Sequence, residues 1–265
     1  MSETNFTTPP APQPAYAGAA APDMSTPETL TGIFFEPGRT FEALRERPRF
    51  LVAALIGIVT FMAFYVVYIE RVGYDNLIDA EVSVARKTRP NVTEEQLQQG
   101  AEIQKKPLVK MIRMWSPIIV FLVIYAAGAA IYLLGANLMG GSMSYKKALA
   151  VWAYSSLPPL LIVMVLNLVL LFVSPPDDDA SIAQGLGRGL VRANPAAFVD
   201  ATAHPVLAAA LGSFDLIAFF GLFLAALGLR KVGRMSSGNA WAVVIVLWGL
   251  GVLARVVIAL AFGRA

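Results

Sequence analysis

The sequence predicts an all-α protein: a polytopic bundle of five membrane-spanning helices, preceded by a short amphipathic helix at the membrane interface. Of the 265 residues, 57% are hydrophobic and only 15% are charged, and the mean hydropathy is +0.62. A soluble domain of this size carries more charge. Five apolar stretches each reach the length of about 20 residues that a helix needs to cross a bilayer. These predicted spans are residues 50–69, 115–139, 149–173, 206–229 and 240–262.

Composition excludes several classes of function. The chain has no cysteine, which removes disulfides, thiolate nucleophiles and thiolate metal sites. The pI of about 9.2 is compatible with nucleic-acid binding, but the net charge is only +3 and the basic residues are concentrated beside the spans. Anionic lipid headgroups are therefore the expected partner, and nucleic acid is not. No motif specifies a reaction, so we expect neither enzymatic activity nor a cofactor.

Residues 1–30 are predicted to form a disordered Pro/Ala-rich tail. Few large apolar side chains are present there to offset the entropy lost on ordering. The tail would act as a spacer, or alternatively as a ligand for proline-recognising domains. Its prolines are Pro9, Pro10, Pro12, Pro14, Pro22 and Pro27.

A short helix is predicted just before the first span. Pro37 can open it and Pro48 closes it. Phe41 and Leu44 lie three residues apart and share a face, so the helix is expected to lie in the headgroup region. A protein-binding motif is the alternative. Four arginines surround this face: Arg39, Arg45, Arg47 and Arg49.

Basic residues in the short connections predict the orientation of the spans, since cytoplasmic flanks carry an excess of Lys and Arg. Besides the four arginines, these are Lys146, Lys147, Arg230, Lys231 and Arg234. They predict a cytoplasmic N-terminus, an external C-terminus, and external loops at residues 70–114 and 174–205. The first of these loops carries eight basic residues, which opposes the assignment; its seven acidic residues offset this only in part.

Both long loops carry helix signals. Thr93 and Gln96 fit a capping box that would begin a polar helix, and Pro107 would begin the next helix before span two. In the second loop, two prolines precede the acidic run at residues 177–179. A metal site would need further ligands from elsewhere, so we interpret this run as a solvated turn.

Ionisable groups within the spans are the first candidates for function, because an unpaired charge in lipid costs several kcal/mol. Asp215 lies about nine residues into span four, and Arg255 lies about seven residues before the end of span five. Their depths differ by only a few ångström at about 1.5 Å per residue, so an ion pair is possible. Alternatively, Arg255 extends to the headgroups on its own, or Asp215 belongs to a proton or ion path.

Span three contains the densest group of exceptional residues. Two consecutive prolines remove two helical hydrogen bonds, so the span is expected to kink or break. The neighbouring serines can bond the freed carbonyls; a substrate or lipid contact is the functional alternative. The residues are Tyr154, Ser155, Ser156, Pro158 and Pro159.

The order of these features resembles the bacterial branch of the Yip1 domain family, which consists of five-span membrane proteins. The most specific part of the likeness is residues 140–158, and the resemblance extends over about residues 34–262. It implies a membrane domain at residues 31–265 and a bacterial inner membrane. Eukaryotic relatives have a cytosolic N-terminus and associate with prenylated Rab GTPases in vesicle trafficking. The tail here shares no motif with their N-termini, so that role is not carried over.

Two hypotheses of function follow. The first is a non-enzymatic scaffold that recruits lipids or other partners, such as membrane or cytoplasmic proteins, at its basic cytoplasmic face. The second is a small transporter or permeation protein that uses Asp215 and the third span.

Overall fold

The structure is a computed structural model that describes residues 22–262 except residues 90, 192 and 202. The described part contains α-helices and one short 3₁₀ helix, and no strand. In chain order the elements are α1 (Thr26–Phe35), α2 (Pro37–Glu46), α3 (Leu51–Val72), α4 (Tyr74–Thr88), α5 (Glu94–Lys105), α6 (Pro107–Leu138), α7 (Tyr145–Val173), α8 (Asp179–Arg188), η1 (Pro195–Phe198), α9 (Pro205–Leu211), α10 (Leu216–Gly233) and α11 (Ser237–Phe262).

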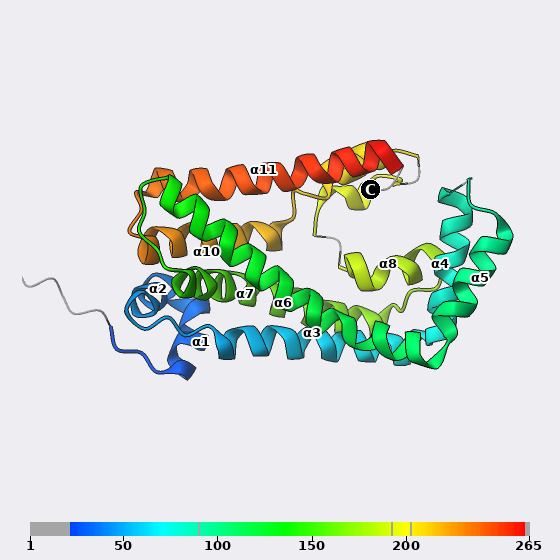
Figure 1. The fold of residues 1–265 in the computed structure, drawn as a ribbon, viewed down its shortest axis with the longest axis horizontal. Coiled ribbons are helices and arrows are strands. Elements are labelled where there is room, and N and C mark those ends of the chain that lie inside the picture. Colours follow the sequence, from blue (N-terminus) through cyan, green and yellow to red (C-terminus); the bar gives the residue numbers. More distant parts are fainter. Residues whose placement is uncertain (1–21, 90, 192, 202, 263–265) are drawn as a thin grey trace, which may run out of the picture.

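Five helices are long and apolar enough to cross a membrane, which confirms the predicted fold class. They are α3, α6, α7, α10 and α11, and they run along the long axis of the molecule (Figure 1). Helix α7 lies centrally, because α3, α6 and α10 all pack against it. Helix α6 begins at Pro107, as predicted from that proline, and not at residue 115. Its 32 residues extend about 48 Å, so it projects beyond a hydrocarbon layer of about 30 Å.

The fourth span differs from the prediction. Residues 206–229 were expected to form one helix, but α9 ends at Leu211 and α10 begins at Leu216. Asp215 adopts an extended backbone (φ −93°, ψ 127°) and its side chain caps α10. A hydropathy average over the length of a span does not detect this break, because the apolar residues on both sides outweigh Ser213 and Asp215. Asp favours the N-cap position since its carboxylate accepts backbone N–H bonds that the helix leaves unpaired.

The N-terminal region is also more ordered than predicted. Helix α1 begins at Thr26, inside the segment assigned to the tail, and a capping box between Ser25 and Glu28 starts it. Residues 1–21 lie outside the described part. Helix α2 opens at Pro37 as expected. Its apolar face, with Phe41 fully buried, packs against α10 rather than facing headgroups, and a Cβ at Gly228 would lie 2.9 Å from the Phe41 ring.

The third span continues through its two prolines as a single helix, so the prolines do not break it. The Ser155 and Ser156 hydroxyls both donate to the carbonyl of Trp152. They do not bond the carbonyls of Tyr154 and Ser155, which the prolines leave free. Helix α10 supports this stretch instead: the position of a Cβ at Gly221 is 3.2 Å from Pro159 and 3.7 Å from the Ser155 oxygen.

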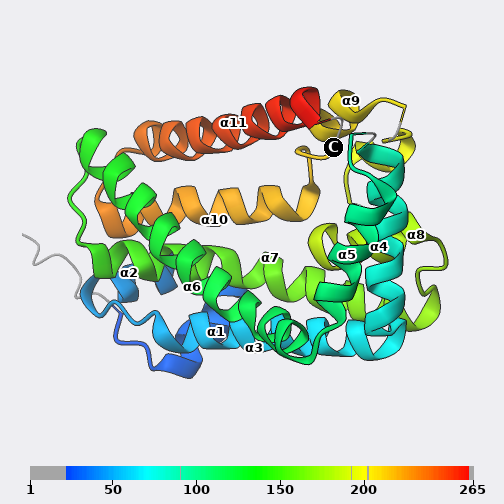
Figure 2. The ribbon, with the colours of Figure 1, turned by 45° about the vertical axis from the view of Figure 1, so that its right-hand side comes forward.

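Helices α4, α5 and α8 cover the end of the bundle opposite α1 and α2. Figure 2 shows α4 and α5 standing across that end, with α8 beside α4. Thr93 and Gln96 form the predicted capping box of α5. Asp178 accepts from the N–H groups of Ala180 and Ser181 and so begins α8. Within the described residues, no three His, Cys, Asp or Glu side chains come together to hold a metal ion.

Close contact between α6 and α7 generates a testable expectation. Gly128 on α6 lies directly against the Trp152 ring on α7, where a Cβ would clash. We predict that Gly128→Ala lowers the free energy of unfolding by about 1–3 kcal/mol, because the ring cannot move without disturbing the core. Thermal unfolding of the purified protein in detergent measures this. Gly249→Ala is the matched control, since nothing lies within 4 Å of its Cβ position. Equal effects of the two substitutions would contradict this packing.

Candidate functional site

The basic segments that the sequence assigned to one side meet at one end of the bundle, which we call the basic end. The Ser142 N–H donates to the Gly233 carbonyl at 2.9 Å, and the Asn239 side chain donates to the Met139 carbonyl at 2.8 Å. Lys231 pairs with Glu42 at 2.5 Å. These contacts join the loop after α6, the turn after α10 and helix α2, at the left of Figure 1.

Five of the nine predicted basic residues are already engaged within the protein. Four form ion pairs: Arg39 with Glu36, Arg45 with Glu46, Arg47 with Asp23, and Lys231 with Glu42. The fifth, Arg49, donates to the Met24 carbonyl and the Thr26 hydroxyl, and so holds the start of α1. These five side chains have structural roles.

The other four basic residues form what we call the cation cluster: Lys146, Lys147, Arg230 and Arg234. Among the described residues none of the four has an ion pair or a side-chain hydrogen bond. Lys146, Arg230 and Arg234 are exposed, and Lys147 is half-buried. The basic end therefore carries positive charge that the folded protein does not neutralise.

Glu46 shows that two members of the cluster, Lys147 and Arg234, lie close to each other. The hydrogen bond from Arg45 holds the pKa of Glu46 below its ordinary value, and the charges of Lys147 and Arg234 act in the same direction. Residues from α2, α7 and the α10–α11 turn are thus close enough to act on one carboxylate. An anionic ligand placed here would interact with several cations at once.

Asp215 and Arg255, the candidates within the spans, do not come together. One Asp215 oxygen accepts from the N–H groups of Ile217 and Ala218 at 2.9 and 3.0 Å. The other accepts from Asn194 at 3.2 Å. Arg255 is exposed on α11, and no ion pair of the described residues involves it. Asp215 is therefore a helix cap, and the expected pair is absent.

The polar group of the third span is also enclosed by protein. Tyr154 is fully buried, and its hydroxyl is hydrogen-bonded to that of Thr29 at 2.9 Å, which ties α1 to α7. Ser155 and Pro158 are buried as well, while Ser156 and Pro159 are half-buried. Tyr154, Ser155 and Pro158 are therefore covered by other parts of the protein, and only Ser156 and Pro159 retain some exposed surface.

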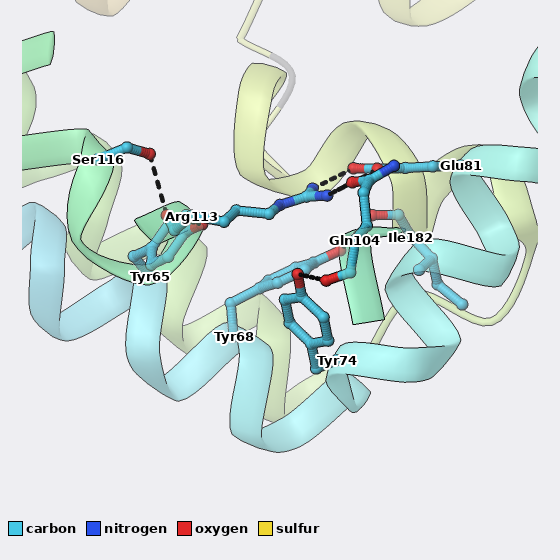
Figure 3. Close-up of polar contacts among 8 residues, drawn as sticks. All are labelled: Tyr65, Tyr68, Tyr74, Glu81, Gln104, Arg113, Ser116 and Ile182. Atoms are coloured by element: carbon cyan, nitrogen blue, oxygen red, sulfur yellow. Dashed lines mark hydrogen bonds and ion pairs between the residues drawn. The ribbon is translucent and has the colours of Figure 1, made fainter. Parts of the chain in front are cut away.

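A polar cluster at the opposite end had no counterpart in the sequence analysis (Figure 3). Arg113 of α6 forms a two-pronged ion pair with Glu81 of α4 and also bonds Gln104 of α5. The Tyr74 hydroxyl donates to the Gln104 carbonyl at 2.9 Å, and burial raises the pKa of Tyr74. The cluster fixes the α4–α5 hairpin to α6. Its partners lie too far apart along the chain for any local spacing to reveal them.

Comparison with known proteins agrees with this architecture. The family model described as the Yip1 domain matches residues 31–258. The membrane protein YknW of Bacillus subtilis is 26% identical over 224 residues, which cover 84% of this chain and 86% of that protein. No solved structure matches the chain.

The capping role of Asp215 predicts different effects for two substitutions. Asp215→Ala removes the acceptor for two N–H groups and leaves Asn194 unpaired, so the free energy of unfolding should fall by about 1–2 kcal/mol. Asp215→Asn keeps an acceptor oxygen at the cap and should cost less than about 0.5 kcal/mol. Unfolding midpoints in detergent distinguish the two. If both variants lose the same stability, the negative charge, and not the cap, is what the fold requires.

Proposed function

This chain belongs to the Yip1 domain family, and we propose that it serves as a non-enzymatic membrane scaffold that gathers anionic lipid headgroups at its basic end. Protein partners in the membrane or at its surface would be recruited to the same face. The proposal rests on the cation cluster, whose four side chains have no ion pair in the described part of the chain. Each Lys or Arg near an anionic membrane surface contributes about 1 kcal/mol to attraction.

We further propose that the basic end faces the cytoplasm of a bacterial inner membrane and that the C-terminus lies outside. The unneutralised cations support this, because cytoplasmic flanks carry the excess of Lys and Arg. At the opposite end, three of the eight basic residues of the first long loop are paired with acids, and the other five are offset by the four remaining acidic residues of that loop. These pairs are Arg86 with Glu94, Lys105 with Asp79, and Arg113 with Glu81.

The alternative, a permeation protein that uses Asp215 and the third span, has less support. Both oxygens of Asp215 are engaged in hydrogen bonds. Tyr154 is bonded to Thr29 and buried. An ion or proton path needs polar groups that line a common route, whereas Asp215 caps α10 and Tyr154 ties α1 to α7.

The proposed orientation can be tested directly, because the chain has no native cysteine. Ser142 at the basic end and Gln99 on α5 are both exposed. In intact bacterial cells, a membrane-impermeant maleimide should label the Gln99→Cys variant. It should label the Ser142→Cys variant only after the inner membrane has been permeabilised. The opposite labelling pattern would show that the basic end faces outward.

Lipid selectivity tests the scaffold proposal. Neutralising the whole cation cluster should remove the preference for phosphatidylglycerol over phosphatidylcholine, and reduce binding of the former at least about tenfold. Native mass spectrometry of the full-length protein measures bound lipid. The changes are Lys146→Gln, Lys147→Gln, Arg230→Gln and Arg234→Gln.

A second variant with the same change in net charge is the control. It neutralises the four ion-paired cations of the basic end: Arg39, Arg45, Arg47 and Lys231. This control should keep most of the lipid preference, with circular dichroism verifying that both variants retain their helices. Equal losses would mean that net charge alone, and not the cluster, attracts lipid.

A further inference from the structure

Arg234 has a backbone conformation that an arginine rarely adopts. Its φ and ψ are 55° and 36°, in the left-handed region, and no other described residue except glycine has a positive φ. Glycine usually occupies this position after a helix, because a Cβ is strained there. The C-terminal end of α10 is otherwise regular. The N–H groups of Arg234 and Met235 both donate to the Arg230 carbonyl, and the Met235 side chain is buried.

In the described part of the chain the Arg234 side chain forms no hydrogen bond, and its charge acts on Glu46 without forming an ion pair. The side chain is exposed. A cation at the end of α10 also interacts favourably with the helix dipole, but Arg230 and Lys231 already lie in the last turn. Stability alone would therefore favour glycine at position 234, and a strained residue whose side chain has no hydrogen bond or ion pair within the described residues indicates a functional role.

The position of Arg234 places it at the surface of the bilayer. Only residues 234–236 connect α10 to α11, and both helices span the membrane. A connection this short cannot leave the headgroup layer. Tyr145 and Trp241, at the starts of α7 and α11, are both exposed at the same end. Tyr and Trp concentrate at the membrane interface, so these two side chains indicate that this end of the bundle lies in the headgroup layer.

We infer that Arg234 is the phosphate-binding residue of this end, and that its ligand is the phosphodiester of an anionic glycerophospholipid. The guanidinium presents parallel N–H donors that match two phosphate oxygens. Lys147 and Arg234 both act on Glu46, so Lys147 lies close enough to attract the same headgroup. This assignment rests on the proposed scaffold function and names the residue and chemical group through which it acts.

Replacing Arg234 by glycine separates binding from folding. In Arg234→Gly the affinity of the full-length protein for phosphatidylglycerol should fall about tenfold, as for loss of one charge-assisted hydrogen-bonded pair. Binding of phosphatidylcholine with the same acyl chains should fall less, because the choline cation of that lipid already balances the charge of its phosphodiester. The melting temperature should stay constant or rise by about 2 °C, because glycine relieves the strain. Loss of stability in place of lipid affinity would overturn the inference.

Three further variants sharpen this test. Arg234→Asn also removes the charge but tolerates the left-handed backbone, so it should reproduce the loss of affinity if the glycine variant unfolds. Arg39→Gln removes the same formal charge at an ion-paired position and should leave the affinity within about twofold. Glu46→Gln removes the carboxylate beside Arg234 and Lys147, and should raise the affinity several-fold.

Soluble glycerol 3-phosphate distinguishes a lipid from a free phosphate as the ligand. It should not displace phosphatidylglycerol at millimolar concentration, because the site lies in the headgroup layer where lipid is abundant. Displacement at equal concentration would overturn the lipid assignment. If Arg234→Gly binds lipid normally while the fourfold variant does not, the inference about Arg234 fails and the scaffold proposal stands. If the fourfold variant also binds normally, both fail.

Discussion

The constraint on which this structure depends is that lipid offers no hydrogen bonds to the backbone. Each span must therefore bond its own peptide groups or borrow partners from side chains and neighbouring helices. At the interruption between α9 and α10, the Asp215 carboxylate accepts the N–H groups of Ile217 and Ala218, and Trp248 donates to the carbonyl of Ser213 at 3.2 Å. The same requirement explains why an acidic residue is tolerated in an apolar stretch.

The basic residues also fall into two groups: those that are paired within the protein and those that have no ion pair in the described part of the chain. At the basic end, four acids neutralise four cations and hold α2 and the start of the described chain in place. The cation cluster is what remains, and it lies where the connections between spans are shortest. At the opposite end, Arg86, Lys105 and Arg113 pair with acids of α4 and α5. The other five basic residues of the loop at 70–114 have no ion pair in the described part of the chain, but the seven acidic residues of that loop nearly balance its eight basic ones.

The N-terminal helices extend the bundle beyond its five spans. Phe41 and Leu44 are fully buried, and the Thr29–Tyr154 hydrogen bond connects α1 to the central helix α7. The apolar face of α2 is thus part of the protein core. The charged residues of the basic end are therefore carried by elements that pack into the protein core.

The sequence by itself determined the membrane class, the five spans, the opening of α2 at Pro37 and the capping box of α5, because length, apolar composition and local capping patterns act over a few neighbouring residues. It also grouped the nine basic residues on one side. Only the tertiary structure decided that Asp215 ends a helix and does not pair with Arg255, that Arg113 pairs with Glu81, and that four cations have no ion pair in the described part of the chain. Those outcomes depend on contacts between residues distant in the chain, whose geometry is set by how the helices pack and not by any local spacing.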